Sequence, residues 1–482
     1  MSAALAYPLP TIIQGGMGIG VSSWGLARTV SLCGQLGVVS GTAIDSLFVR
    51  RLQDGDLGGH LRRAMERFPL PDVSADALAN YFLPDGRTDG APYRLLSMWR
   101  QTVSRAREQI TMLASFVEVH LAKEGHDGPV GINLLTKVQM PNLATLYGAM
   151  LAGVDYVLMG AGIPQEIPGA LDAMAAGDPA TMKLHVESQP RGEVTELRLD
   201  PAAHFDGAPP AVRRPAFLPI ISAHSLATML TRKANGSVEG FVIEGPTAGG
   251  HNAPPRGRLE LDDDGQPIYG DRDHADLAAM RDLGLPFWLA GGTGNPERLE
   301  VALAEGAAGV QVGTLFALSQ ESGLDPVVRE AVLEKARHGE AEVRTDILAS
   351  PTGFPFKVLS LEGTNSEQEP YERRERVCDL GYLREPFRRE DGRLDYRCAA
   401  EPVDTYVKKG GAAENTVGRK CLCNALMANV GHAQERADGP ERAIVTTGDD
   451  LATARHLLAG RDGYSATDVV EFLLSRRTAA VG

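Results

Sequence analysis

The chain has 482 residues, and its composition of 43% hydrophobic and 23% charged residues is typical of a soluble globular protein. Its net charge of −14 is spread along the chain without any tract of lysine and arginine, which argues against nucleic-acid binding. No apolar run approaches the ~18 residues that a membrane span requires, so we expect no insertion into a membrane.

The N-terminal sequence MSAALAYPLP has neither the basic segment nor the apolar segment of a secretory signal. The first core strand is expected to begin near Thr11, which leaves no room for a cleaved signal. We therefore predict a cytoplasmic protein.

Eight short β-rich runs, each followed by helical sequence, recur through the first 320 residues. They are TIIQG (11–15), LGVVSG (36–41), PVGINLL (129–135), VDYVLMG (154–160), FLPIISA (217–223), GFVIEG (240–245), LPFWLA (285–290) and AGVQVG (308–313). Several are apolar throughout, as expected of parallel strands that are covered on both faces.

Helical sequence fits between these runs. Ser23 is a candidate helix N-cap, and Asn295 precedes Pro296 at the first turn of another helix. The alternation predicts an α/β fold, a (β/α)8 TIM barrel, whose active-site residues follow the C-terminal ends of the strands.

Two connections are too long for the plain barrel. Residues 42–128 are predicted to hold more than one helix, and an apolar stripe over residues 96–121 predicts a helix that covers the core. The stripe consists of Leu96, Trp99, Val103, Ala106, Ile110, Leu113 and Val117. Residues 176–216 predict a β-hairpin around MKLHVES and VTELRLD. A lid and an oligomer contact are both open roles for these insertions.

The barrel pattern stops before the C-terminal part of the chain. We predict a barrel domain over residues 1–344, with insertions at about 42–128 and 176–216, and a C-terminal extension over residues 345–482. The extension is expected to pack against the barrel. It contains SPTGFPFK, a cluster of cysteines and an amphipathic helix around SATDVVEFLLSRR.

Glycine-rich turns follow four of the predicted strands. They are QGGMGIG, TAGGH, AGGTGN and QVGTLF. Glycine pairs let the backbone approach a ligand closely and aim successive N–H groups at it. At the ends of the last two strands, with helices following, this arrangement predicts a phosphate site.

His251 follows the TAGG turn and is expected at the mouth of the barrel. A neutral imidazole at that place could abstract a proton or polarise a substrate oxygen near physiological pH. Taken alone, the residue would more often be a turn or surface histidine, but the other glycine turns placed around it favour the functional interpretation.

Four of the five cysteines lie in the extension, and two interpretations of them are open. Four thiolates would suit zinc or an iron–sulfur cluster, but no C-x2-C spacing is present, which favours structural or free thiols. The residues concerned are Cys378, Cys398, Cys421 and Cys423.

Several of these motifs together resemble a known family. The sequences PTIIQGGMG, GINLL, AGGH, LAGGTGNPERLEVALAEGAAGVQVGTLF and the pair Glu321-Ser322 are similar to those of nitronate monooxygenases, or 2-nitropropane dioxygenase-like FMN flavoproteins. The resemblance covers roughly residues 8–325 in order. Similar barrels include flavin-dependent enoyl-acyl carrier protein reductases and the trans-acting reductases of polyunsaturated fatty acid and polyketide synthases.

The resemblance implies bound FMN and assigns site residues to it. Those near the flavin ring would be Gly15, Gly16, Met17 and Asn133. Those near the phosphate would be Gly249, Gly250, Gly291, Gly292, Gly313 and Thr314, with Gln311 close by. His251 matches the family's catalytic histidine, which assists deprotonation of the carbon next to the nitro group.

The sequence departs from the family at the sixth predicted strand. Glu244 stands at the cofactor where family members often carry Gln, and Thr247 stands where they carry Glu. A carboxylate at this place would disfavour an anionic reduced flavin unless it is protonated or paired. The insertions and the extension are also absent from compact nitronate enzymes, so the substrate is more in doubt than the cofactor.

The resemblance predicts an enzyme, an FMN-dependent oxidoreductase that oxidises a nitronate or a similar carbon acid with O2 as acceptor. The alternative is an NAD(P)H-dependent enoyl thioester reductase, for which a carrier protein or a lipid or polyketide synthase would be the partner. A third alternative, from another class, is a barrel that binds a phosphate ligand without redox chemistry. A small-molecule substrate is expected in each case except a pure scaffold, and a homo-oligomer stays open.

Overall fold

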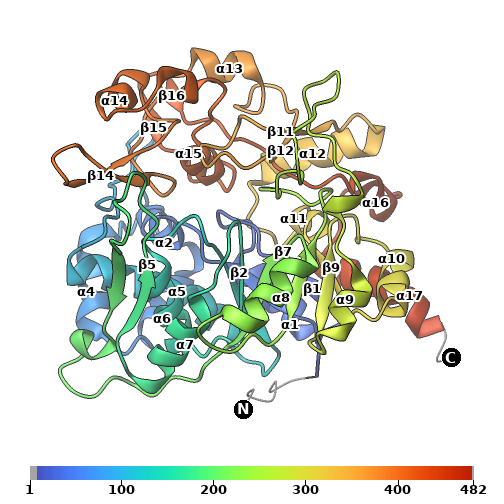
Figure 1. Cartoon of the computed structure of the whole chain (residues 1–482), viewed down its shortest axis with the longest axis horizontal. Helices are drawn as coiled ribbons and strands as arrows, with labels where there is room; N and C mark the ends of the chain where they lie inside the picture. The colour runs from blue at the N-terminus through green and yellow to red at the C-terminus, as the bar shows by residue number, and fades with distance from the viewer. Residues whose placement is uncertain (1–7, 480–482) are drawn as a thin grey trace.

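The computed structural model describes residues 8–479, and Figure 1 shows its arrangement. The sequence-based expectation about a targeting segment concerns residues 1–10, of which residues 1–7 lie outside the described part. Among the described residues, no helix combines the length and the apolar character that crossing a membrane would need.

All of the predicted barrel strands form, and they lie in one sheet. The strands are β1 Ile12–Gln14, β2 Gly37–Ser40, β3 Val130–Leu135, β4 Tyr156–Gly160, β7 Ala216–Ile221, β8 Phe241–Glu244, β9 Phe287–Ala290 and β10 Gly309–Val312. The eight strands follow the order β1-β10-β9-β8-β7-β4-β3-β2, and every pair is parallel. This confirms the predicted (β/α)8 barrel.

The two ends of the strand order meet and close the barrel. The backbone N–H of Gln14 donates to the Leu36 carbonyl at 2.9 Å, and the N–H of Leu36 donates to the Ile12 carbonyl at 3.1 Å. Both bonds lie just before β2, where Ile13 and Leu36 form a parallel bridge. The barrel therefore has no free edge between its first two strands.

A separate apolar cluster fills the barrel interior. It contains Ile13, Leu36, Val38, Tyr156, Leu158, Leu218, Val242, Trp288 and Ala290. Because side chains alternate along a strand, a residue two positions after an interior residue faces the same side. Glu244 follows Val242 by two positions, so it faces into the top of the barrel.

Helices lie between the barrel strands and after the last of them. They are α1 Trp24–Leu32, α6 Asn142–Leu151, α7 Ile167–Ala176, α8 His224–Lys233, η3 Asp271–Asp273, α9 Leu277–Asp282, α10 Pro296–Ala304, α11 Thr314–Ala317 and α12 Pro326–His338. Two predicted caps form: Ser23 Oγ accepts from the N–H of Leu26 at 3.1 Å, and Asn295 Oδ1 accepts from the N–H of Arg298 at 2.9 Å.

The first insertion is helical. It consists of α2 Ile44–Gln53, η1 Leu57–Gly59, α3 His60–Met65, α4 Pro71–Tyr81 and α5 Arg105–Lys123. The predicted helix over residues 96–121 is wrong in its first part, because α5 begins at Arg105. Ser104 ends the preceding irregular segment by capping the helix, its Oγ accepting from the N–H of Arg107 at 3.2 Å. Trp99 is buried before the helix starts, and its indole donates to Asp45 at 3.1 Å.

The second insertion contains the predicted hairpin. Strands β5 Ala180–Lys183 and β6 Glu196–Leu199 pair antiparallel, and η2 Pro201–His204 follows. Alternate residues of both strands are buried, which explains the period-two pattern of their sequences.

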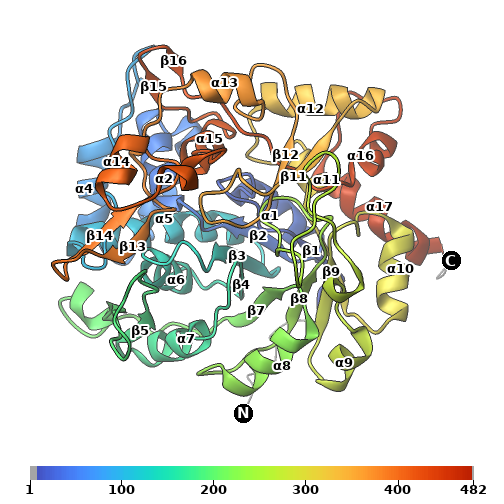
Figure 2. The same cartoon turned by 45° about the horizontal axis from the view of Figure 1, so that its top comes forward.

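The extension lies above the barrel strands in Figure 1, and in Figure 2 its elements lie along the upper side and at the right of the barrel. Its elements, with β11 just before it, are β11 Val343–Asp346, β12 Phe356–Leu359, α13 Gln368–Arg373, β13 Glu385–Arg388, β14 Leu394–Arg397, α14 Val403–Lys408, η4 Ala413–Thr416, α15 Leu422–Ala428, β15 Glu435–Arg436, β16 Gly439–Pro440, α16 Leu451–Leu457 and α17 Ala466–Ala479. The last helix, α17, packs beside α1 and α10 on the outside of the barrel. The division of the chain at residue 344 stays a prediction.

Candidate active site

A cavity of about 510 Å³ opens at the C-terminal ends of the barrel strands. All the predicted site residues line it: Gly15, Gly16, Met17, Asn133, Glu244, Gly249, Gly250, His251, Gly291, Gly292, Gln311, Gly313 and Thr314. They come from the ends of five different strands, so the parallel barrel brings them together.

The turn after β1 packs tightly against the end of β3. A Cβ atom added to Gly16 would lie 2.0 Å from the Cβ of Asn133, so only glycine fits there. The turn is held by Ser22, whose Oγ accepts from the N–H of Met17 at 2.8 Å. This glycine keeps the floor of the cavity thin and lets Asn133 reach its surface.

Two amide side chains on the cavity wall have no hydrogen-bond partner among the described residues. Gln311 Oε1, at the end of β10, is buried and unpaired. The amide of Asn133, whose residue is only 6% exposed, also makes no hydrogen bond within the described part of the chain. Buried polar groups normally have partners, so these amides are suited to a ligand in the cavity.

Glu244 lines the cavity with a carboxyl group that is neutral at physiological pH. Burial raises the pKa of its carboxyl to about 8, because the charged form loses its hydration. No described residue forms an ion pair or a hydrogen bond with this carboxyl group. At neutral pH the side chain is therefore mainly protonated and can donate a hydrogen bond.

The glycine turns after β9 and β8 have left-handed backbone. Gly291 and Gly292 have φ angles of 90° and 65°, and Gly250 has φ of 77°, all unfavourable for other residues. Within the described residues, the N–H groups of Gly291 and Gly292 have no partner. The N–H of Gly250 donates to the hydroxyl of Thr446, a residue of the extension, at 3.0 Å.

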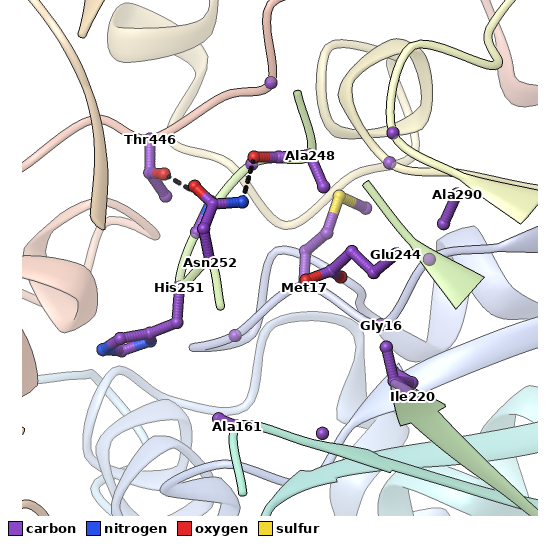
Figure 3. Close-up of a pocket in the computed structure, with 18 of the residues that line it drawn as sticks. Gly16, Met17, Ala161, Ile220, Glu244, Ala248, His251, Asn252, Ala290 and Thr446 are labelled. Carbon is purple, nitrogen blue, oxygen red and sulfur yellow. Dashed lines mark hydrogen bonds between the residues drawn. The ribbon is translucent and has the colours of Figure 1, made fainter. Parts of the chain in front are cut away.

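His251 lines the cavity but is also bound to the extension. Its Nε2 lies 2.7 Å from the hydroxyl of Ser350, and its ring meets the Phe356 ring edge-on at 4.9 Å between centroids. Figure 3 shows the His251 ring pointing away from Glu244. Burial, with a smaller contribution from the Lys137 charge, lowers the pKa of His251 to about 4. The imidazole is therefore neutral at physiological pH.

Residues 174–371 match the family model described as nitronate monooxygenase. Over this segment the chain is similar to the nitronate monooxygenase family. This confirms the resemblance predicted from the sequence. The matched segment contains strands β7 to β10 and His251, and the N-terminal strands and residues 372–482 lie outside it.

Two curated relatives match part of the chain. A protein of Mycobacterium tuberculosis named "(3aS,4S,5R,7aS)-5-hydroxy-7a-methyl-1-oxo-octahydro-1H-indene-4-carboxyl-CoA dehydrogenase" is 26% identical over 231 residues, which cover 45% of this chain and 60% of that protein. The protein of the same name from Rhodococcus jostii is 26% identical over 147 residues, covering 30% of this chain and 36% of the relative. The chain thus spans less than two thirds of the length of either relative.

Solved structures resemble the chain at a lower sequence identity than the curated relatives do. FabK from Thermotoga maritima has a TM-score of 0.46 and 16% identity, covering 99% of this chain and 95% of that chain. A nitroalkane oxidase from Streptomyces ansochromogenes has the same TM-score and identity, covering 99% of this chain and 98% of the other.

The cavity has a second wall that was not predicted, and most of it lies outside the matched family domain. The extension contributes Phe354, Phe356, Tyr382, Leu383, Leu422, Leu426, Thr446, Thr447, Gly448 and Asp450 to the lining. The sequence VTTGDD at 445–450 carries a turn signal, Gly followed by Asp, but nothing in it indicates which part of the barrel it would contact.

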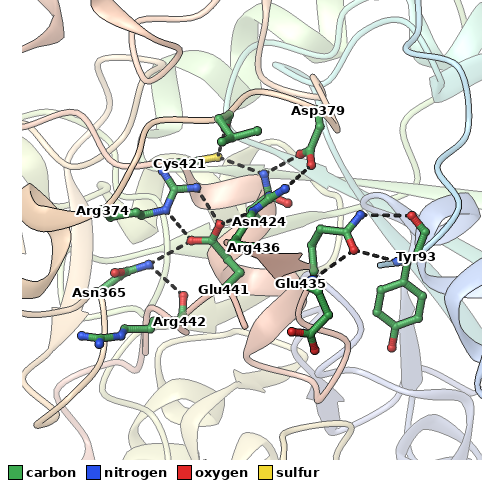
Figure 4. A network of polar contacts seen from close by, with 12 residues as sticks. Tyr93, Asn365, Arg374, Asp379, Cys421, Asn424, Glu435, Arg436, Glu441 and Arg442 are labelled. Atoms are coloured by element: carbon green, nitrogen blue, oxygen red, sulfur yellow. Dashed lines mark hydrogen bonds and ion pairs between the residues drawn. The ribbon is translucent and has the colours of Figure 1, made fainter. Parts of the chain in front are cut away.

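The four cysteines of the extension are free and border one small cavity. Among the described residues, no group of three or more His, Cys, Asp or Glu side chains is placed to hold a metal ion. Burial raises the pKa of all four thiols, to about 12 for Cys378, so the protonated form is favoured when no metal ion is bound. Figure 4 shows Cys421 beside a network in which Arg374 binds Glu441 at 2.7 Å and Arg436 binds Asp379 at 2.7 Å.

Proposed function

We propose that the chain is an FMN-dependent oxidoreductase whose cofactor lies across the C-terminal ends of the barrel strands. The observation that carries the proposal is the convergence of the predicted flavin residues on one cavity, where the N–H groups of Gly291 and Gly292 and the amides of Asn133 and Gln311 have no partner among the described residues. The free N–H groups of Gly291 and Gly292 suit a phosphate, and the unpaired oxygen of Gln311 suits an N–H of the flavin ring. The close approach of Gly16 to Asn133 leaves no side chain at position 16 that would occupy the place of the ring.

Bound FMN would supply the hydride and single-electron chemistry, and the protein would supply position and polarity. Protonated Glu244 would donate a hydrogen bond from the wall of the cavity, which removes the objection that a carboxylate there would repel a reduced flavin. His251 is neutral, and Ser350 holds its Nε2. A pKa near 4 makes this imidazole a weak base, so we assign it the role of a hydrogen-bonding group that polarises a substrate oxygen.

Within this class, the cavity favours an unsaturated acyl thioester over a small nitronate. The wall that the extension adds is largely apolar, with Phe354, Leu383, Leu422 and Leu426 among its residues. Such a wall suits an acyl chain, whereas a nitronate anion offers little apolar surface to bury. The two curated relatives are named as dehydrogenases of a carboxyl-CoA, which is also a thioester. Nitronate oxidation is the second candidate, because the family model carries that name.

Anaerobic mixing tests the proposal. The purified protein should show the visible absorbance of a flavin, or gain it on incubation with FMN. On the thioester hypothesis NADPH should bleach the flavin, and a 2-enoyl-CoA should restore its colour. On the nitronate hypothesis a nitronate should bleach it and NADPH should not. A protein that neither contains nor binds FMN would instead be a barrel for another phosphate ligand, and the proposal would be rejected.

A further inference from the structure

One segment of the extension contacts the glycine turns of the cavity directly. We call residues 446–450 the latch. Three of its contacts reach three different strand ends: Gly448 N–H donates to Thr314 Oγ1 at 2.9 Å, Asp449 N–H donates to the Thr247 carbonyl at 3.1 Å, and Asp450 Oδ2 accepts from the N–H of Gly294 at 2.9 Å. The latch therefore joins the loops after β8, β9 and β10.

Glycines on both sides allow this close contact. A Cβ on Gly249 would lie 2.7 Å from the backbone nitrogen of Gly448, and a Cβ on Gly448 would lie 2.8 Å from the Thr247 carbonyl oxygen. A Cβ on Gly294 would meet Asp450 Oδ2 at 2.2 Å. Gly249 was predicted to approach a phosphate, whereas here its absent side chain makes room for the latch.

The two acidic residues of the latch are turned toward the protein. Both carboxylate oxygens of Asp449 lie 2.8 Å from Nζ of Lys357, a buried residue of β12. Asp450 accepts from the N–H of Gly294 and from the hydroxyl of Thr453, the latter at 2.7 Å. These contacts fix the latch and pair Asp449 with a lysine. Asp450, which lines the cavity, is held by two neutral donors and has no cationic partner among the described residues.

One polar side chain of the latch is left without a partner. Thr447 lines the cavity and is 5% exposed, yet its hydroxyl makes no hydrogen bond within the described part of the chain. Its backbone lies against Gly249, and its neighbour Gly448 binds Thr314. Asp450 of the latch binds Gly294, two residues after Gly292 in the loop whose Gly291 and Gly292 N–H groups are also free. A buried hydroxyl without a partner is costly, so a ligand at this place would relieve the cost.

We propose that the latch is a wall of the cofactor phosphate site and that the Thr447 hydroxyl donates a hydrogen bond to the phosphate. The inference rests on the proposed function, because it assumes that FMN binds in the cavity. It adds a phosphate ligand from the extension, outside the part of the chain that matches the family model. The cofactor would then be held by the barrel and the extension together.

Thr447→Val tests the inference, since valine keeps the shape of threonine and removes only the hydroxyl. Dissociation constants for FMN and for riboflavin, which lacks the phosphate, are measured by flavin fluorescence on the apoprotein. We expect Thr447→Val to weaken FMN binding about tenfold or more, as for a lost hydrogen bond to a charged group, and to leave riboflavin binding unchanged. Thr447→Ser should bind FMN nearly as the wild type does.

The Tm of the apoprotein gives a second measurement. If Thr447 had a purely structural role, its substitution would lower this Tm, which is the opposite of what we expect. Removing an unpaired buried hydroxyl should leave the apoprotein Tm equal or higher, while the rise in Tm on adding FMN becomes smaller. The matched control is Thr416→Val, which removes a buried hydroxyl of the extension that donates to the Ala413 carbonyl at 2.7 Å. It should lower the apoprotein Tm and leave FMN affinity unchanged.

Three results would overturn the inference. They are unchanged FMN affinity in Thr447→Val, equal weakening of FMN and riboflavin, and a lower apoprotein Tm without a specific loss of FMN. Failure of the proposed function looks different, because then the wild-type protein binds neither FMN nor riboflavin.

Discussion

At the scale of single residues, Glu244 determines how the cavity responds to pH. Its carboxyl has an ordinary pKa of 4.5 and a folded-state pKa of about 8. Between these values the unfolded chain has lost the proton and the folded chain keeps it. The free energy of unfolding therefore falls as the pH rises from 4.5 toward about 8. The stabilising contribution of the protonated carboxyl is fully present only below pH 4.5.

We expect Glu244→Gln to remove this dependence, because glutamine is neutral at every pH and has nearly the same shape. Relative to the wild type, the variant apoprotein should gain Tm steadily as the pH rises through the interval, with no further gain above about 8. Unfolding curves of both proteins across this range measure the effect. Parallel Tm curves for the two proteins would show that Glu244 is ionised in the folded chain.

His251 allows a test of the proposed chemistry. Its pKa of about 4 places its titration below the working range, so the rate of flavin bleaching should show no dependence on pH from this residue near its ordinary pKa of 6.5. His251→Asn should keep FMN bound and slow bleaching by about 10²-fold if the imidazole contacts the reacting substrate. Stopped-flow absorbance measures both quantities. An unchanged rate would remove His251 from the mechanism.

At the scale of elements, the extension is tied to the helical insertion through a buried ion pair. Arg107 of α5 lies 2.7 Å from Asp45 of α2, and their side chains are 4% and 1% exposed. The hydroxyl of Tyr382, which belongs to the extension and lines the cavity, donates to the same carboxylate. The roof of the cavity thus depends on a charge pair between two helices of the insertion.

Asp45→Asn should destabilise the protein by about 3 to 5 kcal/mol, because it leaves the buried Arg107 charge without its partner. Urea unfolding followed by circular dichroism measures the change. Glu330→Gln is the matched control, since Glu330 pairs with Arg337 at 3.0 Å on the surface and is 59% exposed. The control should change stability by less than about 1 kcal/mol. Equal losses of unfolding free energy in the two variants would show that the buried ion pair contributes no more to stability than the exposed one.

Apolar runs and the turn residues that end them predicted every barrel strand, because both signals are local in the sequence. They also predicted which barrel residues line the cavity, since the ends of parallel strands must meet at one face. The helix boundary at Arg105 was missed because the apolar stripe continues through Trp99, which is buried by a long-range contact with Asp45. The latch was missed for a similar reason: the contact between Thr447 and Gly249 joins segments far apart in the sequence, and no local pattern encodes it.

At the scale of the whole molecule, our proposal makes the extension part of the cofactor site, so cofactor binding and order in the extension should be coupled. A ligand that binds only the closed form stabilises it by RT ln(1 + [L]/Kd), which is about 2.7 kcal/mol when free FMN is 100 times its Kd. Because the latch is a wall of the phosphate site in our proposal, a chain with an open latch would lack part of that site and should bind FMN more weakly. Amide protons that exchange only through this opening should then be protected by roughly 100-fold.

The amides to follow by hydrogen exchange are those that hold the latch closed, namely the N–H groups of Gly250, Gly294, Gly448 and Asp449. FMN should slow their exchange and riboflavin should slow it less, because only FMN carries the phosphate. The Leu184 N–H, which donates to the Thr195 carbonyl at 2.8 Å in the β5–β6 hairpin, serves as the control and should be unaffected. Protection of the barrel amide of Gly294 without protection of Gly448 and Asp449 would mean that the extension covers the cavity without taking part in binding the cofactor.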